Sequence, residues 1–135
     1  MKTLGCLLAV TSLSSAASAC RDAVAPPAVA CPGDSVTVQV RAGLSGPEFS
    51  WTPPCLMGRI EVDSSDVPLW LISTNDSNQV PPPVNFGAEP GGMRTVVSPQ
   101  PLTLGRSYTV AVWRWVSGDT HSALFFRAGT ASFLQ

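Results

Sequence analysis

LTLGRSYTVAVWRWV, residues 102–116, is the longest β-type run in the chain and decides the fold. Successive side chains of a β-strand point to opposite faces of a sheet, so residues two apart share a face. One face of this run carries Tyr108, Val110 and Val112, and the other carries Trp113 and Trp115. If the tyrosine and valines face the core, both tryptophans lie on the outer face of the sheet.

The rest of the chain after Cys31 reads as short strands separated by turns. Thirteen prolines fall mostly between these segments, and no ten-residue window beyond the first residues keeps a helical period. Such spacing predicts an all-β fold, a two-sheet antiparallel β-sandwich of about seven strands over residues 31–135. The other predicted strands cover residues 35–40, 49–51, 59–63, 69–72, 84–86, 94–97 and 123–127.

Two motifs resemble fibronectin type III domains, relatives of the immunoglobulin fold. Trp51-Thr52-Pro53-Pro54 is similar to the buried tryptophan and proline pair that end the second strand of that family. Residues 102–108 resemble its Leu-x-Pro-Gly-x-x-Tyr corner, with Leu104 where proline is typical. The resemblance implies that Trp51 and Tyr108 are core residues and that the Tyr108 hydroxyl bonds back to the turn before it. It implies no activity.

The first residues form an export signal. Lys2 precedes a short apolar core, and small residues then lead to Cys20, so residues 1–19 read as a cleaved signal peptide. Ser18-Ala19-Cys20 resembles the end of a bacterial lipoprotein box, with Ala17 where that pattern usually has leucine. We therefore expect a small lipoprotein anchored in the cell envelope through Cys20, with residues 20–30 as a tether. The alternative is a plain secreted or periplasmic protein.

The cysteine count supports this expectation. Cys6 leaves with the signal peptide, so Cys20, Cys31 and Cys55 remain in the exported chain. An odd number in an oxidising compartment suggests that one thiol has a separate fate. Lipidation of Cys20 would leave Cys31 and Cys55 to form a disulfide.

The sequence contains few residues that could form a catalytic or a metal-binding site. His121, the one histidine, lies in a predicted turn beside Asp119 and Ser122, where neighbouring side chains point apart and cannot align as a triad. Asp63, Asp66 and Asp76 supply oxygen ligands for calcium, but their spacing matches no known calcium loop. We predict no enzyme activity, no metal site and no cofactor.

Charge and surface aromatics limit the choice of partner. Without residues 1–19 the chain has seven basic and nine acidic residues, a net charge of −2, which does not favour nucleic acid. Trp113 and Trp115, with Phe125 from the last strand, form a candidate binding surface for an envelope protein or polysaccharide. Arg114 lies on the opposite face, which gives some support to a neutral ligand. The alternatives are that a loop, the tether or Phe133 covers these rings, and that the domain is purely structural.

Overall fold

Two antiparallel sheets make up the computed structural model, which describes residues 31, 33, 35–116 and 124–135. The predicted signal peptide, tether, Cys20 and His121 lie outside the described residues. The strands are β1 (Thr37–Gly43), β2 (Gly46–Thr52), β3 (Arg59–Ser64), β4 (Val67–Ser73), β5 (Val84–Asn85), β6 (Arg94–Val97), β7 (Ser107–Val116) and β8 (Leu124–Leu134).

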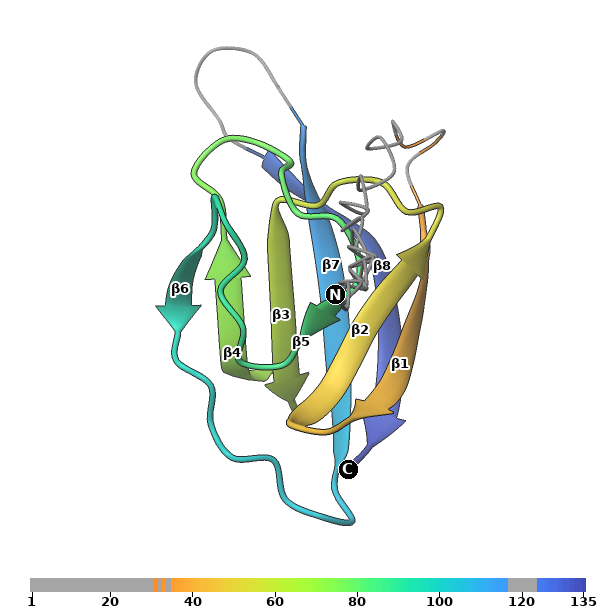
Figure 1. Cartoon of the computed structure of the whole chain (residues 1–135), viewed down its shortest axis with the longest axis vertical. Coiled ribbons are helices and arrows are strands. Elements are labelled where there is room, and N and C mark those ends of the chain that lie inside the picture. Colours follow the sequence, from red (N-terminus) through yellow and green to blue (C-terminus); the bar gives the residue numbers. More distant parts are fainter. Residues whose placement is uncertain (1–30, 32, 34, 117–123) are drawn as a thin grey trace, which may run out of the picture.

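The smaller sheet has the order β1-β2-β5 and lies across the larger sheet, β6-β4-β3-β7-β8 (Figure 1). All strand pairs are antiparallel, and the predicted all-β sandwich is confirmed. The described residues hold eight strands, and each falls on one of the eight segments that the sequence predicted, including the short β5 and β6.

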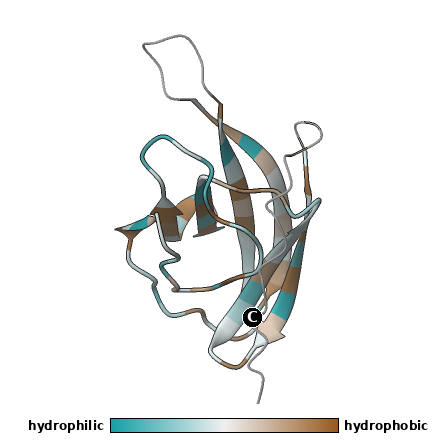
Figure 2. Cartoon of the chain, turned by 45° about the horizontal axis from the view of Figure 1, so that its top comes forward, coloured by the Kyte–Doolittle hydropathy of each residue, from teal (hydrophilic) through white to brown (hydrophobic). Residues whose placement is uncertain are grey.

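The core lies between the two sheets and follows the predicted alternation. Tyr108, Val110 and Val112 of β7 are buried, and Trp51 of β2 is 2% exposed. Along the strands apolar residues alternate with polar ones (Figure 2). The largest rings form a chain of contacts across the core: the ring centroids of Phe49 and Trp70 are 6.2 Å apart.

The turn before β7 holds the tyrosine in place. The hydroxyl oxygen of Tyr108 accepts a hydrogen bond of 2.7 Å from the backbone N–H of Thr103. Gly105 adopts φ of 77°, a left-handed conformation that glycine takes without a steric penalty. The ring thus closes the end of the core while its one polar atom is satisfied.

The last strand is longer than the sequence predicted. β8 begins at Leu124 and ends at Leu134, whereas the predicted strand ended at residue 127. Small and polar residues follow Arg127, so the strand signal fades although pairing with β7 continues as far as Ser107. The prediction was wrong because this pairing, and not the local composition, defines the strand.

A β-bulge divides β8 into two parts. Val112 pairs with Gly129 and Trp113 pairs with Arg127, which leaves Ala128 as the extra residue. The backbone carbonyl of this alanine accepts a 2.9 Å hydrogen bond from the N–H of Val36, so β8 meets the start of β1 there. No side chain fits at Gly129, since a Cβ atom would lie 2.5 Å from the carbonyl oxygen of Val36.

The disulfide between Cys31 and Cys55 fixes the other end of the domain. Their Cα atoms are 5.0 Å apart, within the range for a bridge. Cys55 is 1% exposed, and its carbonyl accepts a 2.7 Å hydrogen bond from the indole N–H of Trp51. The predicted bridge therefore ties the segment before β1 to the connection between β2 and β3.

Candidate functional site

The outer face of β3, β7 and β8 carries most of the candidate surface. Strand register sets Arg59, Trp113 and Arg127 in one row across these three strands. Residues directly opposite each other share a face of the sheet. Trp115 and Phe125 form the next row, towards the end of the hairpin. We call these five residues the aromatic–arginine patch.

Trp113 is held between two arginines. The guanidinium carbon of Arg59 lies 5.3 Å from the indole centroid, and that of Arg127 lies 5.7 Å from it. Both distances are within the range of cation–π attraction. The arginines come from the strands on either side of β7, and the indole between them is only partly exposed. Trp113 is therefore a support for the two guanidinium groups more than an open stacking platform.

Trp115 and Phe125 form the aromatic end of the patch. Their ring centroids are 5.5 Å apart and their planes meet at 70°, an edge-to-face arrangement. Phe125 also packs against Gly58, where an added Cβ atom would lie 3.0 Å from its ring. Both rings remain partly exposed.

The loop after β4 fixes the backbone beneath this aromatic pair. The side-chain amide of Asn78 donates a 2.9 Å hydrogen bond to the carbonyl of Trp115 and accepts one of 2.7 Å from its N–H. A side chain thus takes the place of a neighbouring strand at this position. The sequence did not predict this contact.

Small and apolar residues lie beneath the long side chains. Ala111 and Leu71 face outward in the row of Glu61, yet they are 4% and 6% exposed. The long side chains of neighbouring rows shield them, as amphipathic stems commonly do.

The alternative that Phe133 covers the tryptophans is wrong. Its ring lies inside the sandwich, 5.7 Å from that of Phe49 and 5.6 Å from that of Tyr108. Phe125 and Phe133 have the same parity along the chain, but the extra residue Ala128 puts them on opposite faces.

The charges on this face are mixed. Arg59 donates to the Glu61 carboxylate at 2.9 Å, the one salt bridge among the described residues. Burial raises the pKa of Asp63, one row further along, with smaller contributions from Glu61 and Asp66. Arg127 opposes this rise in pKa, so its charge acts on the same face.

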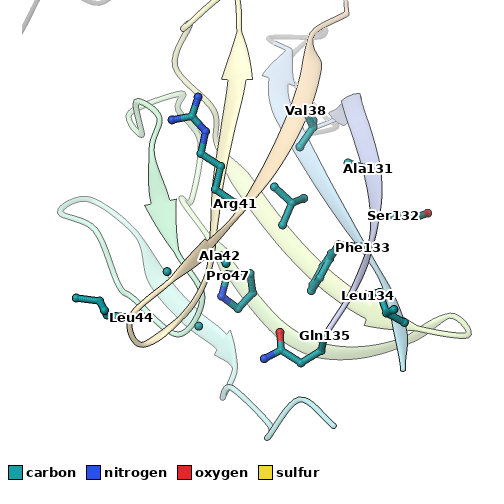
Figure 3. A pocket seen from close by; sticks show the side chains of 13 residues that line it. Val38, Arg41, Ala42, Leu44, Pro47, Ala131, Ser132, Phe133, Leu134 and Gln135 are labelled. Atoms are coloured by element: carbon teal, nitrogen blue, oxygen red, sulfur yellow. The ribbon is translucent and has the colours of Figure 1, made fainter. Parts of the chain in front are cut away.

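A hollow lies at the opposite end of the domain from the patch, between the edges of β1 and β8 (Figure 3). Its volume is about 540 Å³, and Val38, Ala131 and Phe133 contribute its apolar part. Val38 and Phe133 project into the space between the strands, while Leu44 points away from the hairpin tip (Figure 3). The sequence did not predict this hollow, because it arises where two non-consecutive edge strands diverge.

The described part of the chain contains neither a cluster of metal-ligating side chains nor a helix that could span a membrane. Among residues 31, 33, 35–116 and 124–135, no three His, Cys, Asp or Glu side chains group to hold a metal ion. The same residues include no helix long and apolar enough to cross a membrane.

The sequence predicted the three aromatic residues of the patch as a candidate surface but neither of its two arginines. Arg59 lies in a predicted strand and Arg127 ends another, but neither residue signals by itself that it stacks on an indole. The signal available was the parity of Arg127 relative to Phe125, which places both on one face. Comparison of the chain with protein families, with curated proteins and with solved structures finds no match.

Proposed function

We propose that this protein is a non-catalytic binding module of the bacterial cell envelope, and that the aromatic–arginine patch is its ligand surface. The observation that carries the proposal is the patch itself: large rings and two guanidinium groups are gathered on an open sheet face. Aromatic and arginine side chains are the residue types that contribute most to binding energy at interfaces.

The domain type that we propose is a fibronectin type III or immunoglobulin-like sandwich. Sheets of order β1-β2-β5 and β8-β7-β3-β4 support this assignment, with β6 as an additional edge strand. The Tyr108 corner and the buried Trp51 support it as well. Domains of this architecture serve many unrelated functions, so the ligand is argued from the patch.

Anchoring at Cys20 is the second part of the proposal. The Cys31–Cys55 disulfide accounts for two of the three cysteines expected in the exported chain. Cys20 then remains for lipidation at the position that the lipoprotein box predicts. The anchor would hold the patch near the membrane surface, with residues 20–30 as the tether.

Binding of the protein to envelope material tests the patch. The Cys20→Ser form, freed from the membrane, would be added to envelopes of cells that lack the protein. Phe125→Ala should weaken retention about tenfold, as expected for an aromatic contact worth about 1.4 kcal/mol. Phe126→Ala is the matched control, because this neighbouring ring is 47% exposed and pairs with Arg114 away from the patch.

Equal retention of the two variants would contradict the proposal and favour a purely structural domain. A melting curve of each variant is needed first, since Phe125 also packs on Gly58. Membrane fractionation of the chain with and without Cys20→Ser tests the anchor separately.

A further inference from the structure

The two guanidinium groups of the patch occupy defined positions. Each lies over the indole of Trp113 at a cation–π distance, which restricts a side chain that is otherwise mobile. The largest separation that their central carbons can have is 11.0 Å, the sum of their distances to the ring centroid. Restrained arginines lose less conformational entropy when they bind an anion.

Their charges are only partly neutralised. Glu61 pairs with Arg59, whereas Arg127 forms no salt bridge with any residue that the structure describes. The Nε atom of Arg59 and the indole nitrogen of Trp113 are buried and have no acceptor in the described part of the chain. These N–H groups add positive partial charge beneath the patch, although the whole chain is slightly acidic.

We propose that the patch binds a linear acidic polysaccharide whose sugar rings carry carboxylates, a polyuronate. This inference rests on the proposed function and names the ligand class of the same surface. It replaces the neutral ligand expected from Arg114, because Arg59 and Arg127 lie in one row with Trp113, whereas the carboxylates of this face, Glu61 and Asp63, lie in the rows that follow.

Two features favour a polymer of acidic rings. Cations on either side of an indole suit carboxylates repeated along a chain better than one isolated anion, since planar guanidinium groups bind carboxylates through paired N–H donors. Trp115 and Phe125, in the adjacent row, offer apolar surface to a neighbouring sugar ring.

Binding of oligogalacturonate to the purified protein, measured by titration calorimetry, tests the proposal. The fully methyl-esterified oligomer is the matched probe, because it keeps the rings and loses the charges. Arg127→Gln should weaken binding of the acidic oligomer about tenfold, the value of a charge-assisted hydrogen bond of about 1.4 kcal/mol. Arg41→Gln removes an equal charge from the exposed face of β1 and should have no effect.

Glu61→Gln should have the opposite effect on the affinity for the acidic oligomer. Loss of this carboxylate frees Arg59 from its 2.9 Å pair and should tighten binding several-fold. Raising the salt concentration should weaken binding of the acidic oligomer, because screening reduces attraction between exposed charges.

The results distinguish failure of the polyuronate inference from failure of the proposed function. Equal affinity for the esterified oligomer, with loss of binding in Phe125→Ala alone, would overturn the acidic ligand and leave the proposed function standing. Stronger binding of poly-L-glutamate than of oligogalacturonate would also overturn it, in favour of an acidic peptide. Absence of binding to both acidic polymers would overturn the inference, while envelope retention still tests the patch.

Discussion

Removal of the disulfide through Cys31→Ser should cost the domain about 3.5 kcal/mol of unfolding free energy. The bridge joins residues separated by 24 positions in the sequence. In the chain-entropy model, closing a loop of this length removes about 12 cal/mol/K of entropy from the unfolded state, which gives the stated energy at 25 °C. Melting temperature should fall by roughly 15–25 °C for a domain of this size.

Cys31 is the informative position because it is only partly buried, so its replacement isolates the cross-link. Cys55 is 1% exposed, and Cys55→Ser would place a hydroxyl in the core as well. We expect this second variant to lose about 1–3 kcal/mol more than the first. Cys20→Ser should leave stability unchanged.

Guanidinium unfolding followed by tryptophan fluorescence is a suitable assay, since the indole of Trp51 donates to the carbonyl of Cys55. The slope of the unfolding free energy against denaturant should rise in Cys31→Ser, because the unfolded chain exposes more surface without the cross-link. A loss below about 1 kcal/mol would refute the reasoning: either the bridge does not form in the exported protein, or the reduced chain keeps its compactness when unfolded.

Three further predictions concern two side chains that hydrogen-bond to the backbone and one carboxylate. Tyr108→Phe should cost about 1–2 kcal/mol in urea unfolding, because the N–H of Thr103 loses its acceptor at 2.7 Å. Asn78→Ala should cost about 1–3 kcal/mol and speed amide hydrogen exchange at Trp115, whose N–H and carbonyl both lose a partner. The fold raises the pKa of Asp63 above 3.8 and so disfavours its charged form. Asp63→Asn should therefore raise the melting temperature at pH 7, and this gain should vanish as the pH falls below 3.8. If Asp63→Asn still melted at a higher temperature than the native chain at pH 3, by the same margin as at pH 7, the raised pKa of Asp63 would be contradicted.

Much of the architecture could be predicted because the strands alternate clearly. In β7 the parity of Tyr108, Val110 and Val112 assigned the core face, and these residues are buried. The bridge between Cys31 and Cys55 followed from counting cysteines in an exported chain. Both inferences use features that can be read directly from the sequence: the alternation of side chains along one strand, and the number of cysteines.

The features that could not be predicted depend on register between distant strands. Arg59 reaches Trp113 only because β3 and β7 pair with these two residues directly opposite each other. Asn78 meets the backbone of Trp115 across 37 positions of sequence. Nothing in the local sequence encodes such distances, and a shift of one residue would move every contact to the other face.

Ala128 connects the core, the sheet contact and the patch. As the extra residue of the bulge, it reverses the facing of β8, so that Phe133 packs in the core while Phe125 and Arg127 point outward. Its carbonyl also accepts the N–H of Val36, which joins the start of β1 to the larger sheet. Bulges bend a strand and re-aim its side chains. Here a single inserted residue lets one strand complete the hydrophobic core at one end and supply a cation and a ring to the outer surface at the other. The proposed binding surface is thus a consequence of the same irregularity that closes the sandwich.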